Sequence, residues 1–319
     1  MASRSPGTSR GEQARGPRAV SVPERRQARV AAMRAEQARR ERQRRALWVS
    51  VTAVAVVVVV VGVLVGVKVS GGGKSTTAAP SGPASAAVVH AVTGVPAATL
   101  TTVGAGKVQT LPKPISAPAL TADGKPRVLY IGAEYCPYCA AERWPMVVAL
   151  SRFGTWAHLG ATSSSSSDVY PSTATLSFHG ATYTSDLLSF AGIEQTTNVR
   201  SGSGYTPLDT VSAADQQLLA TYDVPPYVGS DSAGAIPFVD IGGRYVISGA
   251  SYSPQLLAGK THGQIAAALT DPASPVAQAI DGTANAITAT LCDLTSQKPA
   301  AVCASPAIST LRGTIHADR

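Results

Sequence analysis

Residues 127–139 of the chain read Arg-Val-Leu-Tyr-Ile-Gly-Ala-Glu-Tyr-Cys-Pro-Tyr-Cys. The apolar run Arg127–Gly132 has the length and composition of a buried central strand. The pattern from Pro137 to Phe153 is helical, and Pro137 suits the first turn, where its missing N–H costs nothing. The sequence therefore predicts an α/β domain in which a strand leads, through a sharp turn, into a helix that begins at a Cys-x-x-Cys pair.

This arrangement predicts thiol–disulfide chemistry at Cys136 and Cys139. Unpaired N–H groups and the dipole at a helix N-terminus favour a thiolate, so we expect the pKa of Cys136 to fall below the free value of about 8.5. A second thiol one turn further along can resolve the mixed disulfide that the first one forms. We predict Cys136 as the nucleophile and Cys139 as the resolving thiol. Tyr135 and Tyr138 are expected to form an aromatic rim for a flexible substrate.

The pair has two other interpretations. Half of a zinc site would need two more ligands, typically a second close pair. The other two cysteines lie far along the chain, and the five histidines are scattered and show no ligand spacing. No metal and no cofactor is therefore expected. A purely structural Cys136–Cys139 disulfide stays open, although a bridge that closes four residues constrains little chain.

The remaining cysteines, Cys292 and Cys303, are expected to form a structural disulfide, because such bonds persist on the oxidising side of a membrane. A second redox pair that relays electrons to or from Cys136 is the alternative. Glu142 and Arg143 follow Cys139 by three and four residues, and we interpret them as part of a solvated helix face.

The charge of the chain is concentrated at its N-terminus. Residues 1–45 contain 13 Arg and 4 Glu, a net charge of +9, and the rest of the chain is close to neutral. This segment has no aromatic side chain on which bases could stack, so nucleic acid is not an expected partner. We interpret residues 1–45 as a basic cytoplasmic tail.

A long apolar segment follows the tail. Ala46–Val67 has 22 residues without a charge, and as a helix it would be roughly 33 Å long, which matches a bilayer core of about 30 Å. Arginines crowd its front edge, and the positive-inside rule then places the N-terminus in the cytoplasm. We predict one transmembrane helix at 46–69 and a single-pass protein of the cell membrane. A cleaved signal peptide is the alternative, but its apolar core is usually shorter.

Beyond the membrane segment, composition indicates a flexible linker at 70–87, one extracytoplasmic domain at 88–305 and a C-terminal tail at 306–319. Within the domain, a short helix interrupted by a proline is expected at 88–103, and a strand at 173–185. Ser212 has the spacing of a helix cap. Two short strands, 236–241 and 244–248, are joined by a Gly-Gly turn, and a final helical region opens at 263.

The segment Glu134-Tyr-Cys-Pro-Tyr-Cys139 resembles the active site of thioredoxin-fold oxidoreductases. That resemblance implies a cis-proline that faces the cysteines just before a strand, and Ile236-Pro237 fits it as a substrate-docking segment. Pro237 lies 98 residues after Cys139, more than a minimal thioredoxin fold needs. We therefore expect a helical or loop insertion between the Cys-x-x-Cys helix and the cis-proline strand, for which Leu187–Val228 supplies candidates. Tyr130 occupies the strand position where thioredoxins keep a buried acid.

More closely, residues 88–305 resemble a family of membrane-tethered, thioredoxin-like proteins known as domain of unknown function 929. The resemblance rests on segments that include Gly132–Trp144, Ser163–Pro171 and Gly234–Asp240. It implies a fold and a redox site but no substrate.

These observations favour a membrane-anchored extracytoplasmic thiol–disulfide oxidoreductase. Its expected partners are exported cysteine-containing proteins, a membrane redox partner and the lipid bilayer. The alternative is a non-catalytic binding or redox-sensing protein on a thioredoxin scaffold, with its cysteines structural.

Overall fold

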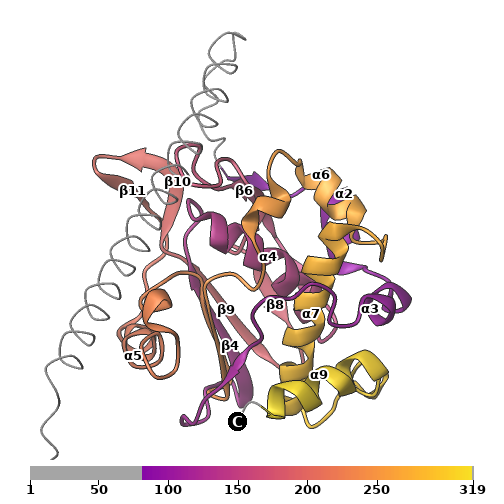
Figure 1. The fold of residues 1–319 in the computed structure, drawn as a ribbon. Helices are drawn as coiled ribbons and strands as arrows, with labels where there is room; N and C mark the ends of the chain where they lie inside the picture. Colours follow the sequence, from indigo (N-terminus) through magenta and orange to yellow (C-terminus); the bar gives the residue numbers. More distant parts are fainter. Residues whose placement is uncertain (1–80, 318–319) are drawn as a thin grey trace, which may run out of the picture. The chain divides into compact units, whose positions relative to one another are not determined.

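The computed structural model describes residues 81–317, which form a mixed α/β domain (Figure 1). The predicted basic tail, the predicted membrane helix at 46–69 and most of the predicted linker lie outside these residues. In the described part of the chain, no single helix is long and apolar enough to cross a membrane. Two consecutive helices, α2 (Ala86–Thr93) and α3 (Ala97–Val103), are long and apolar enough only when taken together, and the pair is bent by 59°.

The centre of the domain is a six-stranded mixed sheet. Its longest strand, β4 (Lys125–Gly132), pairs in parallel with β9 (Ser189–Glu194) on one side and antiparallel with β12 (Phe238–Ile241) on the other. The predicted hairpin is confirmed, because β12 turns back through Gly242-Gly243 into β13 (Tyr245–Ser248). Two short strands, β2 (Lys113–Pro114) and β3 (Thr121–Ala122), extend β13 and the start of β4.

The side chains of the sheet alternate between two apolar cores, as strand geometry requires. On one face, Val128 and Tyr130 pack with Val239 and Ile241 in the larger core, which also contains α4 (Pro137–Leu150) and α7 (Pro275–Leu294). On the other face, Leu129, Ile131 and Phe238 pack under α5 (Ala213–Tyr222). Figure 1 shows α5 on one side of β4 and β9, and α4 and α7 on the other.

The chain between α4 and β12 differs from the expected helical or loop insertion. It consists mainly of strands, and only α5 and a short 3-10 turn, η1 (Ser230–Ser232), are helical. The candidate segment 187–228 even contains β9, a strand of the central sheet. The predicted strand at 173–185 is two strands separated by a turn. The extra strands are β5 (Thr155–Ala157), β6 (Gly160–Ser163), β7 (Ala174–Ser177), β8 (Thr182–Thr184), β10 (Thr196–Ser201) and β11 (Gly204–Pro207).

The helix predicted after Ser212 is confirmed. The hydroxyl oxygen of Ser212 accepts a hydrogen bond from the backbone N–H of Asp215 and caps α5. Arg127 of β4 holds the same helix against the sheet through a two-pronged ion pair with Asp215, at 2.7 and 3.0 Å. Helix α5 is therefore fixed at its N-terminal end by both a cap and a charge.

Both ends of the domain extend further than the sequence indicated. The predicted tail at 306–319 is instead helix α9 (Pro306–Ala317), because Ile308, Leu311 and Ile315 are buried in the larger core. At the other end, β1 (Gly82–Pro83), inside the predicted linker, pairs with β6. The remaining elements complete the C-terminal half: η2 (Pro254–Leu257), α6 (His262–Ala268) and α8 (Ala300–Cys303).

Candidate active site

The two cysteines lie where β4 ends and α4 begins. Cys136 is the N-cap residue of α4, and its Sγ accepts a hydrogen bond from the backbone N–H of Cys139 at 3.3 Å. Both are free thiols. Cys136 retains 5% of its exposure, whereas Cys139 is completely buried. The outer cysteine is therefore the one that a disulfide substrate can approach.

The surroundings give the two thiols opposite acidities. The pKa of Cys136 is lowered, chiefly by the hydrogen bond from the Cys139 thiol, although burial acts to raise it. The backbone N–H groups of Cys139 and Tyr138 and the charge of Arg143 also lower this pKa. Burial raises the pKa of Cys139 well above its ordinary value, and Cys136 adds to the rise. Two titratable groups whose environments push their pKa values apart are a pattern found in catalytic pairs.

The backbone before β12 reaches the outer cysteine. The peptide bond Ile236-Pro237 is cis, as the resemblance implied. The Cys136 thiol donates a hydrogen bond to the Ile236 carbonyl oxygen at 3.5 Å. Phe238, which follows Pro237, pairs with Ile131 near the end of β4, and this register brings the segment to the cysteines. Cys136, Cys139, Ile236 and Pro237 thus lie together at one end of the sheet.

The two predicted rim tyrosines have different neighbours. Tyr138 is 41% exposed and meets the edge of Tyr170, from the loop after β6, with 6.0 Å between ring centroids. Tyr135 is half-buried and stacks on Tyr205 of β11 at 4.2 Å. Arg200 of β10 lies 4.6 Å from the centroid of the Tyr205 ring. The β10–β11 hairpin thus forms part of the same surface.

The prediction for Glu142 and Arg143 is wrong, because both side chains are fully buried. Glu142 accepts hydrogen bonds from the backbone N–H and the hydroxyl of Ser251, and burial raises the pKa of its carboxyl to about 7. Arg143 forms an ion pair with Glu194 at the end of β9. Helix α4 is covered on nearly all sides, so the usual inference from residue type to solvent exposure fails there.

A second buried carboxylate adjoins the turn. Glu134 accepts hydrogen bonds from the hydroxyls of Ser81 and Ser177, while its backbone N–H donates to the Thr196 carbonyl. These contacts tie the turn before Cys136 to β7, to β10 and to Ser81, the residue before β1. The turn is therefore held on three sides by parts of the chain distant in sequence.

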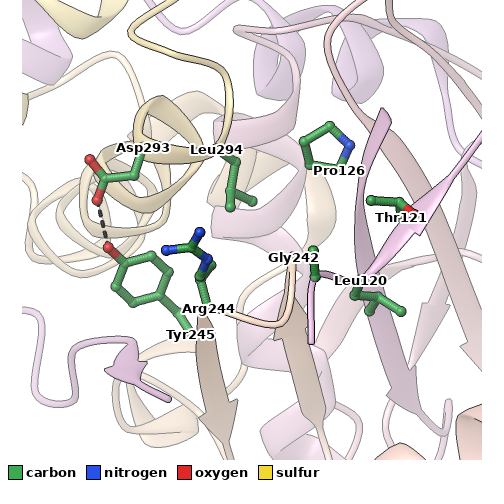
Figure 2. A pocket seen from close by; sticks show the side chains of 9 residues that line it. Leu120, Thr121, Pro126, Gly242, Arg244, Tyr245, Asp293 and Leu294 are labelled. Carbon is green, nitrogen blue, oxygen red and sulfur yellow. Dashed lines mark hydrogen bonds between the residues drawn. The ribbon is translucent and has the colours of Figure 1, made fainter. Parts of the chain in front are cut away.

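The predicted Cys292–Cys303 disulfide is present and links α7 to α8. The next residue, Asp293, accepts a hydrogen bond from the Tyr245 hydroxyl at 2.5 Å beside a pocket of 210 Å³ (Figure 2). Gly242 and Arg244 of the β12–β13 turn also line this pocket. Because that turn is at the far end of β12 from Pro237, the pocket lies away from the thiols.

Across residues 81–317, no group of three or more His, Cys, Asp or Glu side chains is placed to hold a metal ion.

A family model described as Domain of unknown function (DUF929) matches residues 113–293, which is more than half of the chain. The chain belongs to this family. The matched segment of the DUF929 protein contains both cysteines of the Cys-x-x-Cys pair, the buried residues Arg143 and Glu194, and Ile236-Pro237. No curated protein and no solved structure matches the chain.

Sequence reasoning missed four residues of the site in this DUF929 chain. Glu194 and Arg200 belong to strands that the sequence pattern did not identify, and Tyr205 follows them on β11. Arg143 was assigned to the wrong environment. One signal was available: Arg143 follows Cys139 by four residues and Cys136 by seven, so all three project from one face of a helix.

Proposed function

We propose that this DUF929 protein is a membrane-anchored, extracytoplasmic thiol–disulfide oxidoreductase with a thioredoxin-like fold. The single observation that carries the proposal is the environment of Cys136. It is a helix N-cap whose thiol has a lowered pKa, and it lies beside a buried partner thiol and 3.5 Å from a backbone carbonyl. A purely structural cysteine needs none of these features.

The strand arrangement supports the fold assignment. The order β9-β4-β12-β13, with the first pair parallel and the others antiparallel, places the Cys-x-x-Cys helix in the crossover between two parallel neighbours. This is the arrangement expected of a thioredoxin core. Fold alone does not assign an activity, so the proposal depends on the thiols.

The chemistry proceeds in two exchanges. The Cys136 thiolate attacks one sulfur of a substrate disulfide, and the other substrate sulfur leaves with the bonding electron pair and takes up a proton. Cys139 then attacks Cys136 Sγ. The Cys136–Cys139 disulfide forms, and the second substrate sulfur is released as a thiol. The substrate is reduced and the cysteine pair is oxidised; the same steps in reverse place a disulfide in the substrate.

The location and partners follow from the N-terminal segment. A helix at 46–69 would hold the domain outside the membrane, where exported cysteine-containing proteins are the available substrates. Continued turnover needs a membrane redox partner, and a shared bilayer would raise the effective concentration of the two proteins.

The test uses the full-length chain purified in detergent. We expect it to reduce insulin disulfides with dithiothreitol as electron donor, and we expect Cys136→Ser to abolish this activity while the circular dichroism spectrum is unchanged. A parent chain without activity on insulin or scrambled ribonuclease, and with a Cys136 pKa near the free value, would identify a binding or sensing protein instead.

A further inference from the structure

Directly beneath the cysteine pair lies a charged cluster that is closed to solvent. It consists of Arg143 on α4, Glu194 at the end of β9 and Tyr130 on β4, and all three side chains are fully buried. Arg143 donates from Nε to Glu194 Oε1 at 2.8 Å and from Nη2 to Glu194 Oε2 at 2.6 Å. Such short, two-pronged bonds are typical of an ionised carboxylate that faces a guanidinium.

Arg143 also supports the turn that carries the nucleophile. Its Nη2 donates to the Ala133 carbonyl oxygen at 2.7 Å, and the same oxygen accepts the backbone N–H of Cys136. Because Arg143 shares a helix face with both cysteines, its charge lies on their inner side. One side chain thus contacts both the ion-pair partner and the cysteine turn.

The cluster keeps polar atoms without partners. Arg143 Nη1 and the Tyr130 hydroxyl make no hydrogen bond within residues 81–317, although both are buried. The guanidinium carbon lies 5.8 Å from the centroid of the Tyr130 ring. A buried N–H or O–H without a partner costs free energy, and an arginine for which packing is the only requirement would be better replaced by an apolar residue. A buried cation with unpaired N–H groups can stabilise the negative charge of a nearby thiolate.

We propose that Arg143 is a positioning residue that holds a positive charge beneath the cysteines and stabilises their thiolate forms, and that Glu194 limits that charge. Tyr130 occupies the strand position at which thioredoxins, which this segment resembles, keep a buried acid, and Arg143 places a charge of the opposite sign beside the thiols here. The inference rests on the proposed function for its part in turnover, but it concerns a property of the thiols that exists without any substrate.

The stabilised step is the resolving exchange. Cys139 must lose its proton before its sulfur attacks Cys136 Sγ, and burial makes that loss unfavourable. A guanidinium on the inner side favours the thiolate. As the Cys136–Cys139 bond forms, the bond from Cys136 to the substrate sulfur breaks, and the substrate sulfur leaves with the electron pair. It ends as a thiol by taking up one proton, which balances the proton that Cys139 has released.

Other ionisable groups around the two cysteines oppose or moderate the stabilisation of the thiolates by Arg143. Tyr130, Glu134, Tyr135 and Glu194 surround the cysteines from β4, the turn and β9. Arg143 lowers the pKa of both thiols. The charge of Glu194 raises the pKa of Arg143, against burial, and keeps the guanidinium protonated.

The experiment measures the Cys136 pKa in the reduced full-length chain, from the pH dependence of alkylation followed on the Cys136 peptide by mass spectrometry. We expect Arg143→Met to raise this pKa by about one unit, and Glu194→Gln to lower it. Arg143→Lys should retain most of the parent value. The equilibrium with glutathione should shift about tenfold toward the disulfide in Arg143→Met, a change of ~30 mV.

A matched control separates charge from packing. Arg152 lies two residues after the end of the same helix and donates hydrogen bonds to Asn285 and Thr288, and Arg152→Met removes both bonds. That variant should lose stability without moving the Cys136 pKa. If Arg143→Met does not fold, the double variant Arg143→Met with Glu194→Gln leaves no lone buried charge, and its Cys136 pKa should be higher than that of Glu194→Gln alone. Arginine and glutamate variants that shift the pKa in the same direction, or a folded double variant with the Glu194→Gln value, would overturn the proposal. Inactivity of the parent chain on protein disulfides, with these pKa shifts present, would count against the proposed function only.

Discussion

The carbonyl oxygen of Ile236 lies 3.5 Å from Sγ of Cys136, although the two residues are 100 positions apart in the chain. The contact joins the end of β4 to the start of β12, which are neighbours in the sheet. Because Cys136 is only 5% exposed, its sulfur lies against the protein backbone at Ile236. Under the proposed function, a substrate that reacts with Cys136 would also meet the chain at Ile236.

Removal of the inner thiol should trap substrates on the outer one. In Cys139→Ala, a mixed disulfide between Cys136 and a substrate cannot be resolved, so covalent complexes should accumulate in cells and disappear on reduction. Non-reducing gels and mass spectrometry of the Cys136 peptide measure this. Cys136→Ala is the matched control and should give none. Equal recovery from both variants would contradict the assignment of Cys136 as the nucleophile.

Much of this site could be predicted from local sequence. The strand, the turn and the helix start around Cys136 follow from apolar periodicity and from a proline in the first helical turn. The hairpin at Gly242-Gly243 follows from its turn residues, and both of these glycines have positive φ angles of 68°. Each of these signals lies within a dozen residues, which is the range over which sequence patterns act.

The rest depended on contacts between distant segments. Arg143 is buried because β9 supplies Glu194 as its partner, and no local pattern of charged residues indicates such a partner. Helix α9 is part of the core because α7 covers its apolar face, whereas its sequence alone resembles a polar tail. Strand β9 lies within the segment interpreted as an insertion, and only half of its residues are apolar, so its own pattern does not identify a strand of the central sheet. Burial of this kind is decided by tertiary structure.

The exposed ring of Tyr138 and its neighbour Tyr170 should contribute to the binding of protein substrates, but not to the chemistry of the thiols. Tyr138 is 41% exposed beside Cys136, with Tyr170 at its edge. Truncation in Tyr138→Ala removes contact area for a polypeptide, so we expect KM for insulin to rise up to roughly tenfold, since an aromatic contact contributes about 0.5–1.5 kcal/mol. The rate with oxidised glutathione, which is too small to span the rim, should stay within twofold. A parallel loss with both substrates would show that Tyr138 acts on the cysteines instead.

The buried carboxyl of Asp281 makes the stability of the domain depend on pH. It lies in α7, and burial raises its pKa to about 8 from an ordinary value of 3.8; neither of its oxygens has a hydrogen-bond partner within residues 81–317. Its folded pKa is raised, so its stabilising effect is complete below pH ~4 and is lost as the pH rises to about 8. The full loss is on the order of 5 kcal/mol.

Asp281→Asn removes this titration. We expect the variant to resemble the parent at about pH 4 and to be more stable at pH 8, as measured by urea unfolding at both values. Glu142, with a pKa raised to about 7, acts in the same direction and keeps some pH dependence in the variant. A parent and a variant with equal pH slopes would show that Asp281 is hydrated in solution.

Removal of the C-terminal disulfide can distinguish a structural role of Cys292 and Cys303 from a role as an electron relay. Cys303 and Cys292 are both buried, and their bond fastens α8 to α7, where α9 also packs. As a structural bond it should contribute about 2–4 kcal/mol to the free energy of unfolding. We therefore expect the double variant Cys292→Ser with Cys303→Ser to unfold at lower denaturant concentration, but to reduce insulin with dithiothreitol at the parent rate.

As a relay, the disulfide would instead be needed when electrons come from the membrane partner. Turnover in membrane vesicles is therefore the second measurement. Parent-like turnover in vesicles together with reduced stability would show that the bond is structural. Lost turnover at unchanged stability would make Cys292 and Cys303 part of the electron path.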